Sequence, residues 1–328
     1  MNYAGAFAVI GAIVVASSGC GGDEDTGKAD DSPVQDGPRM ATPPANEEFA
    51  PPLHGSERVE LMLEAFDLEP GAETYKCQTF QNPFGKNVAV LQAQSRMTRG
   101  SHHLAVFRVE DNADRAIEDC SGLEFHATIH SAQTPIGKTT YPDGVGAFLS
   151  GAEGVRLNAH YVNLTESAIH AEVRVAIDYS DPESVEFTAA QIYLNDSRLD
   201  IPPGRGSAGG SIALPEQLND IKLISGQSHM HRRGVEFHAM FEDGTPIYAS
   251  DTWSEPPMKA YAPPLPLADV AAIAWQCEYE NETDGHLKFG ESADTDEMCV
   301  FTGFYYPAPQ GQMLVGDTGL DTVARLFK

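Results

Sequence analysis

The sequence has few positively charged residues. Its 21 Lys and Arg stand against 48 Asp and Glu, giving a formal charge of −27 at pH 7, and no stretch concentrates the basic side chains. A nucleic-acid-binding protein needs such a concentration to displace the counterions of the phosphates. We therefore expect no nucleic-acid partner. The acidic surplus is typical of a soluble surface in an extracytoplasmic setting.

Long apolar runs are also rare, and the clearest one lies at the N-terminus. Residues 1–18 are almost wholly apolar or small, and Ser17–Cys20 is followed at once by Gly-Gly-Asp-Glu-Asp. This pattern resembles a bacterial lipoprotein signal peptide, residues 1–20, with Cys20 as the lipidated residue. Because no Lys or Arg precedes the run and Ser17 stands where Leu is usual, a plain secretion signal or a mis-assigned start is the alternative. The run is short and Gly-containing for a transmembrane helix. We expect an exported chain whose membrane contact is the lipid anchor.

Cysteine is scarce, with five residues in the chain. Once Cys20 is set aside, Cys77 and Cys120 fall in the first half, and Cys277 and Cys299 fall in the second. An even number of cysteines outside the cytoplasm predicts disulfides, whereas reduced core thiols would be typical of a cytosolic protein. We expect one disulfide in each half, Cys77 with Cys120 and Cys277 with Cys299.

The length and the hydrophobic pattern predict an all-β protein with two domains. A chain of 328 residues exceeds what one hydrophobic core usually organises. After an acidic, Pro-rich tether at 21–54, the turn cluster Ser180–Glu183 divides the rest into domains at 55–181 and 182–328. Strand-length alternation of apolar residues recurs in both domains. The clearest such runs are Asn87–Gln92, Leu104–Val109, Arg156–Val162, Ala171–Tyr179 and Ala271–Tyr279.

Eleven histidines are present, and five of them form groups that indicate metal binding. Residues two apart in a strand share a face, so His229 and His231 can bind one ion. The adjacent His102 and His103 would point to opposite faces, so joint binding needs a strand end, a bulge or different ring nitrogens. His160 lies in an alternating run of the same half. We assign no metal to the others: His54, His126, His130, His170, His238 and His286.

Met298 indicates which metal these imidazoles bind. Several neutral imidazoles can hold zinc, copper, iron or nickel. Met298 lies before Cys299 and an apolar, aromatic run. A single Met is usually core filler. Beside two imidazoles, however, a thioether suits Cu(I) far better than Zn(II), so the residue set favours copper.

Six motifs, taken in order, resemble those of the type II copper, ascorbate-dependent monooxygenases. Peptidylglycine α-hydroxylating monooxygenase and dopamine β-monooxygenase are members of this family. The resemblance covers about residues 55–310. Its motifs are His102-His103, Asp143-Gly144-Val145-Gly146, His160-Tyr161, Ile201-Pro202-Pro203-Gly204, His229-Met230-His231 and Glu297-Met298-Cys299.

The resemblance implies a fold, a reaction and a set of ligands. The fold is two jelly-roll-like β-sandwich domains that face each other across a solvent-filled cleft. The reaction is hydroxylation of a C–H bond with O2 and ascorbate or a similar reductant. Two copper ions take part. The implied ligands of the electron-transfer copper are His102, His103 and His160, and those of the oxygen-activating copper, the catalytic residues, are His229, His231 and Met298.

Three positions depart from the peptidylglycine enzymes. Those enzymes bind the peptide carboxylate with an Arg, an Asn and a Tyr, where this chain has Gln227, Val300 and Thr302. The departures argue against a peptidylglycine substrate. We expect a different small organic molecule as the partner.

Two other functions compete with a monooxygenase. One is a non-catalytic copper-binding surface lipoprotein that retains the fold. The other is a zinc hydrolase, but no carboxylate stands beside the His229-Met230-His231 motif as an obvious general base. Because all six copper ligands are present in order, the enzyme is the favoured interpretation.

Overall fold

A computed structural model describes residues 47–98, 100–124, 126–215, 218, 220–268, 270–320 and 324–327. The predicted signal peptide with Cys20, and the tether up to residue 46, lie outside this described part. Within it, the chain forms strands, turns and short 3-10 segments and contains no α-helix. No helix of sufficient length and apolar character to cross a membrane is found among the described residues. The all-β prediction is confirmed.

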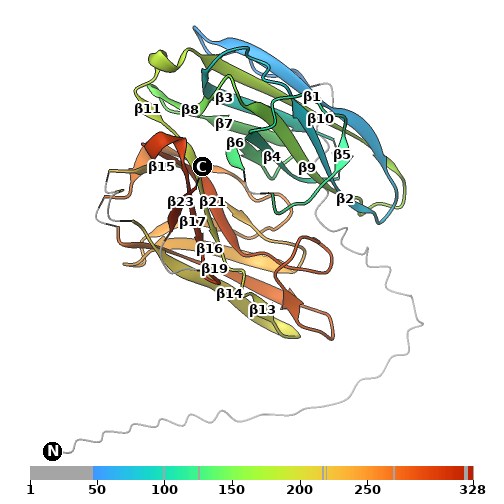
Figure 1. The fold of residues 1–328 in the computed structure, drawn as a ribbon. Coiled ribbons are helices and arrows are strands. Elements are labelled where there is room, and N and C mark those ends of the chain that lie inside the picture. Colours follow the sequence, from blue (N-terminus) through green and yellow to red (C-terminus); the bar gives the residue numbers. More distant parts are fainter. Residues whose placement is uncertain are drawn as a thin grey trace, which may run out of the picture. The chain divides into compact units, whose positions relative to one another are not determined.

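The first half of the chain forms two sheets that enclose one hydrophobic core (Figure 1). One sheet contains, in order of pairing, β1 (Glu57–Leu68), β10 (Ile169–Ser180), β3 (Val88–Met97), β8 (Val145–Leu149) and β11 (Phe187–Thr188), with β7 (Ile136–Thr140) paired to β3. The other contains β5 (Glu118–Asp119), β2 (Glu73–Phe80), β9 (Gly154–Val162), β4 (Ser101–Val109) and β6 (Ala127–Ala132).

The second half also has two main sheets around a core of its own. One sheet contains, in order, β18 (Lys259–Pro266), β15 (Lys222–His229), β21 (Val300–Tyr306), β12 (Ala190–Asn195), β22 (Met313–Asp317) and β23 (Arg325–Phe327). The other contains β14 (Gly204–Ala213), β19 (Ala272–Asn281), β16 (Gly234–Phe241) and β17 (Pro246–Ser250). A two-stranded pair consists of β13 (Asp200–Ile201) and β20 (Leu287–Lys288).

Alternation of apolar residues explains why these segments form strands. Along β19 every second side chain is buried, because successive residues of a strand point to opposite faces. All five runs that the sequence predicts as strands lie almost entirely within strands, namely β3, β4, β9, β10 and β19.

Two strands are buried on both faces, and they bear on the site. In β9, Leu157 and Tyr161 lie in the first core, while Asn158 and His160, which point the other way, are also buried. In β21, Phe301 lies in the second core, whereas the aromatic rings of residues 304 and 306 join the first core. The outer face of each sheet is thus covered, and its polar side chains are removed from water.

The sequence-predicted boundaries differ in two places from the observed structure. Residues 47–54, predicted as tether, are hydrogen-bonded to the first half: Ala50 N–H donates to Gln94 Oε1 (3.1 Å) and Leu53 N–H to Asp178 Oδ2 (3.2 Å). These side chains satisfy backbone groups that would otherwise need water. After the 3-10 turn η1 (Pro182–Ser184), β11 still pairs with β8 of the first half, so the second core begins only at β12.

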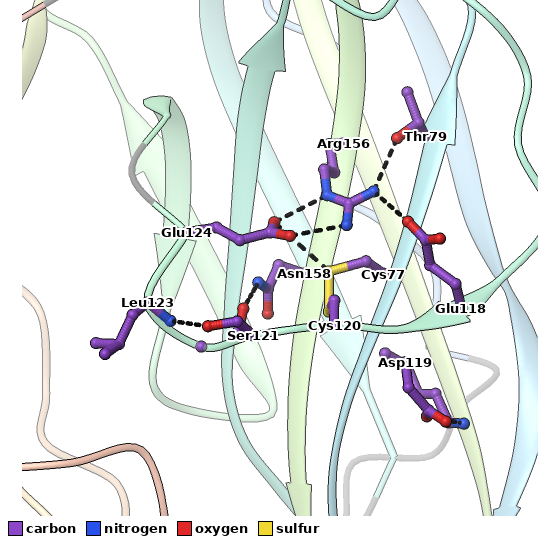
Figure 2. The surroundings of a disulfide bond; sticks show 12 residues. Cys77, Thr79, Glu118, Asp119, Cys120, Ser121, Leu123, Glu124, Arg156 and Asn158 are labelled. Atoms are coloured by element: carbon purple, nitrogen blue, oxygen red, sulfur yellow. Dashed lines mark hydrogen bonds and ion pairs between the residues drawn. A yellow bond between two sulfur atoms is a disulfide. The ribbon is translucent and has the colours of Figure 1, made fainter.

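Both predicted disulfides are present, Cys77–Cys120 and Cys277–Cys299. Figure 2 shows the first, beside the ion pair of Glu124 with Arg156. Disulfides form and persist in oxidising compartments, so the two bridges indicate export.

We predict that removal of the second bridge destabilises the protein. The Cys277→Ala/Cys299→Ala double variant should lose about 3 kcal/mol of unfolding free energy, because the bridge closes a loop of moderate length in the unfolded chain. Urea unfolding of both proteins measures this difference, and thiol titration of the unreduced wild type serves as the control for pairing. A loss below about 1 kcal/mol, or titration of any of the four thiols, would contradict the account.

Candidate metal centre

The first set of histidines, His102, His103 and His160, converges because β4 contains a bulge. Ser101 pairs with Tyr161 and His103 pairs with His160, so β4 has one more residue, His102, than β9 over this step. A bulge bends a strand and redirects its side chains. The rings of His102 and His103 each lie 5.0 Å, centroid to centroid, from that of His160. The bulge therefore lets His102 and His103, although adjacent in the sequence, both face His160.

The second set, His229 and His231 with Met298, begins at the end of β15. His229 is the last residue of that strand, and the rings of His229 and His231 lie 5.2 Å apart. The buried Glu297 carboxylate accepts hydrogen bonds from the backbone N–H groups of His231 (2.9 Å) and Arg233 (2.7 Å). Burial raises the pKa of Glu297 to about 7. These bonds fix the turn that presents His231.

The two sets are in direct contact. The ring of His102 lies 5.1 Å from that of His229 and 5.7 Å from that of His231, and the ring of His103 lies 5.1 Å from that of His229. Ligand atoms of His102, His229 and His231 fall within 4.8 Å of one another, as do those of the first set. His102 is therefore common to both groups. The imidazoles touch, whereas the family resemblance implies sets separated by a solvent-filled cleft.

Five ring nitrogens in this cluster are buried without a hydrogen-bond partner. They are both nitrogens of His102, Nδ1 of His103, Nδ1 of His160 and Nε2 of His231. A buried polar atom without a partner costs about 1–3 kcal/mol, so a native structure rarely groups several of them. Metal ions bound at one nitrogen of each of these four histidines would satisfy four of the five atoms, and the second nitrogen of His102 would carry its proton.

One ring nitrogen of His160, of His229 and of His231 is held by a hydrogen bond. His160 Nε2 lies 2.8 Å from Glu73 Oε1, His229 Nδ1 lies 2.7 Å from Gln133 Oε1, and His231 Nδ1 lies 3.2 Å from the Asp296 carbonyl oxygen. Metal-binding histidines usually donate their second N–H to a carboxylate or carbonyl in this way. The bond fixes the tautomer and leaves the opposite nitrogen as a ligand.

Burial favours the neutral form of all five imidazoles. Burial lowers the pKa of His102, His103 and His229 well below the usual value, and repulsion by neighbouring imidazoles adds to this effect. Burial also lowers the pKa of His231, to about 4. Burial lowers the pKa of His160 as well, although Glu73 opposes the shift. A neutral imidazole retains the lone pair that a metal needs.

Glu73 connects the first set to the second half of the chain. Besides His160, its carboxylate accepts hydrogen bonds from Ser292 Oγ (2.8 Å) and the backbone N–H of Ala293 (2.6 Å). Burial alone would raise the pKa of Glu73, but the hydrogen bonds from these three residues outweigh it and bring the pKa to about 2. Glu73 is thus ionised, and charge-assisted hydrogen bonds of this kind are about twice as strong as neutral ones.

Glu291 forms a second connection in the same region. Its backbone oxygen accepts a hydrogen bond from Tyr75 Oη (2.7 Å), and its carboxylate accepts from Ser121 Oγ (2.6 Å) and Gly122 N–H (3.1 Å). The ring of Tyr75 also stacks on His160 with centroids 3.9 Å apart. The connecting segment, residues 291–296, therefore binds the first half through Glu291, Ser292 and Ala293 and leads through Glu297 to Met298.

The backbone on both sides of Met298 is restrained. Tyr279 Oη donates to the Met298 carbonyl oxygen (2.8 Å), and the next residue, Cys299, is bridged to Cys277. Trp275 Nε1 donates to the Cys299 carbonyl oxygen (3.1 Å). The Met298 side chain is buried and lines a pocket together with His103 and His229.

This pocket, the central pocket, has a volume of about 110 Å³ and lies against both histidine sets. Met298, Val300 and Thr302 all line it, because alternate residues share one face of an extended segment. Of the three departures from the peptidylglycine enzymes, Val300 and Thr302 thus face the pocket. Gln227 is buried outside its lining and donates to the Pro256 carbonyl oxygen (2.7 Å).

The remaining sequence motifs lie outside the histidine cluster. His130 is buried, and its ring nitrogens bond to Thr139 Oγ1 (2.8 Å) and Ser95 Oγ (3.0 Å), which is a structural role. His126 packs against Phe107. The motifs at 143–146 and 201–204 form turns that contain glycines of positive φ.

Sequence reasoning missed Glu73, Gln133 and Glu291. Each contacts a residue far away in the chain, and the contact of Glu73 with Ser292 spans 219 positions. A single acidic residue at the start of a strand carries no local signal of such a role.

Over 300 residues, the chain is 22% identical to tyramine beta-hydroxylase from Caenorhabditis briggsae, a match that covers 80% of this chain and 50% of that protein. The chain thus spans about half the length of this curated relative. No family model matches the sequence.

Among solved structures, the chain is similar to the major capsid protein P2 of bacteriophage PM2, with 6% identity, a TM-score of 0.33 and coverage of 77% of this chain and 99% of that one. It is also similar to the cowpea mosaic virus top component, with 10% identity, a TM-score of 0.27 and coverage of 85% and 97%. Similarity at these TM-scores supports no argument about function.

We predict that Glu73→Gln loosens the connecting segment. The variant loses the ionised acceptor, and its amide N–H groups face the donors of Ser292 and Ala293. Hydrogen exchange of the backbone amides of residues 291–296 should therefore accelerate about tenfold or more. The exposed Glu166→Gln is the matched control. Unchanged exchange in the Glu73 variant would show that this carboxylate does not hold the two halves together.

Proposed function

We propose that this chain is a copper-dependent monooxygenase that hydroxylates a C–H bond of a small organic substrate. The observation that carries the proposal is the cluster of buried, neutral imidazoles with unpartnered nitrogens beside a pocket that Met298 also lines. In the reaction, R–H and O2 with two electrons and two protons give R–OH and water. A reductant such as ascorbate must supply the two electrons. Copper, when bound, supplies one-electron redox chemistry with O2.

The donor set fits copper in both of its oxidation states. We assign His102, His103 and His160 to one ion, and His229, His231 and Met298 to the other. Imidazole nitrogen is an acceptable ligand for Cu(I) and Cu(II), whereas a thioether favours Cu(I). The hydrogen bond to Glu73 leaves Nδ1 of His160 free as a ligand, and that to Asp296 leaves Nε2 of His231.

The residues of the chain also orient the ligands and exclude water. The disulfide at Cys299 and the bond from Tyr279 restrict the flexible Met298 near the pocket, and Glu297 holds the His231 turn. Such support matters because a loosely held ligand loses the productive geometry. Burial of the imidazoles keeps bulk water from the region in which O2 would react.

The curated relative supports a hydroxylase by its name, which describes hydroxylation of tyramine. For this chain we propose the same class of reaction, an oxidoreductase reaction with O2, on a different small molecule. We also propose that the protein is exported and attached to the membrane through a lipid on Cys20. The two disulfides support export.

We predict that His160→Ala lowers the copper content from two ions per chain to about one, because a set of three ligands loses a third of its donors. Metal analysis after dialysis measures this content. His170→Ala, which changes an exposed histidine, is the control and should retain two ions. Two tightly bound ions in the His160 variant would remove that residue from the ligand set.

We predict that Met298→Ala abolishes turnover but leaves Cu(II) binding largely intact, since sulfur stabilises the reduced state more than the oxidised one. Substrate-coupled O2 consumption and metal content are the measurements. Loss of a buried Met costs about 2–5 kcal/mol, so melting must be compared first, with exposed Met62→Ala as the control. Undiminished turnover would refute the ligand assignment. If wild type with copper and reductant consumes no O2 with any C–H substrate, the chain is a copper-binding protein instead.

A further inference from the structure

The carboxylate in the described wall of the central pocket is bonded to an arginine. Among the described residues that line it there is no Lys or Arg, and Glu124 is its one carboxylate. Both Glu124 oxygens accept hydrogen bonds from Arg156, at 2.8 Å to Nε and 2.8 Å to Nη2. Figure 2 shows this paired arrangement, in which the guanidinium also contacts Thr79 and Glu118. Both Glu124 oxygens are therefore already bonded to the guanidinium, which Glu118 shares.

Three polar side chains of the pocket wall, one amide and two hydroxyls, bond to one another. Thr128 Oγ1 donates to Gln191 Oε1 (2.7 Å), and Gln191 Nε2 donates to Thr302 Oγ1 (3.1 Å). Thr302 Oγ1 in turn donates to the Ile192 carbonyl oxygen (3.1 Å). This chain of bonds joins β6 of the first half to β12 and β21 of the second. It gives the pocket a neutral, rigid wall.

The rest of the wall is apolar, and the space is small. Leu104, Phe107, Val300 and Met313 contribute hydrocarbon and thioether surface near His229. The volume of about 110 Å³ is somewhat below that of an apolar cavity of about 150 Å³ that accommodates benzene. A single ring or a short branched chain is the largest group that fits without movement of the wall.

We infer that the central pocket binds a small, largely apolar molecule that carries no ammonium group and whose reacting carbon lies next to His229 and Met298. An ammonium group that entered this pocket would lose its water and find no carboxylate that is free of Arg156, which is unfavourable. A neutral molecule with one hydroxyl or amide group incurs no such penalty. The inference rests on the proposed function, because it identifies the pocket as the substrate site.

The inference separates this chain from its curated relative. Tyramine, the molecule in the name of that relative, carries an amine that is protonated at pH 7. The only carboxylate among the described lining residues, Glu124, is bound to Arg156 and unavailable to an ammonium group. An amine substrate is thus disfavoured here.

Two molecules with the same phenol ring test the inference: tyramine, which is a cation, and tyrosol, which is neutral. Their binding to the oxidised, copper-loaded protein is measured by equilibrium dialysis, without reductant and hence without turnover. Tyrosol should bind about tenfold tighter than tyramine, because the ammonium group loses hydration without compensation. Equal or tighter binding of tyramine, or no detectable binding of tyrosol, would overturn the inference.

A negative charge introduced into the pocket wall should change this order of affinities. Gln191→Glu is isosteric and should raise the affinity for tyramine relative to tyrosol about tenfold, by pairing with the ammonium group. Gln81→Glu, an exposed change outside the pocket lining, is the matched control and should leave the order unchanged. An unchanged order in a folded Gln191→Glu variant would show that the ligands bind elsewhere and would overturn the inference.

Turnover of the same two molecules with ascorbate is measured separately. Preferential binding of tyrosol without O2 consumption would contradict the proposed monooxygenase function but support the ligand class. Turnover with preference for tyramine would support the function and overturn the ligand class.

Discussion

The ionised carboxylate of Glu73 is the interaction on which the arrangement of the site depends. It accepts hydrogen bonds from His160 in the first half and from Ser292 and Ala293 in the second, and its pKa of about 2 keeps it charged at neutral pH. One group therefore fixes the tautomer of a candidate ligand and the position of the connecting segment. Since that segment leads directly into Met298, the geometries of the two histidine sets are linked through it.

Burial of the outer sheet faces determines the chemistry of the cluster. A sandwich on its own would expose His160 and its neighbours on β9 to water, where imidazoles titrate near pH 6.5. Here the second half covers that face, so the imidazoles stay neutral and several of their nitrogens lack partners. The packing of the second half on this face also forms the central pocket, whose wall contains amide, hydroxyl and apolar groups. The proposed copper sites and the inferred preference for a ligand without an ammonium group thus have one physical origin.

Local sequence patterns predicted the strands, the disulfides and the candidate ligands. The spacing of His229 and His231 was informative because strand geometry repeats every two residues. The pattern could not choose among a strand end, a bulge or different nitrogens for His102 and His103, and the β4 bulge answers that question. Contact between the two sets, and the role of Glu73, depend on packing between distant segments, which no local periodicity encodes.

The central claim, that the contacting histidine sets hold two copper ions, is tested most directly by anomalous diffraction at the copper edge from copper-loaded crystals. The account predicts two peaks, one bounded by His102, His103 and His160 and the other by His229, His231 and Met298. A single peak shared by all the imidazoles, or peaks located away from this cluster, would contradict it.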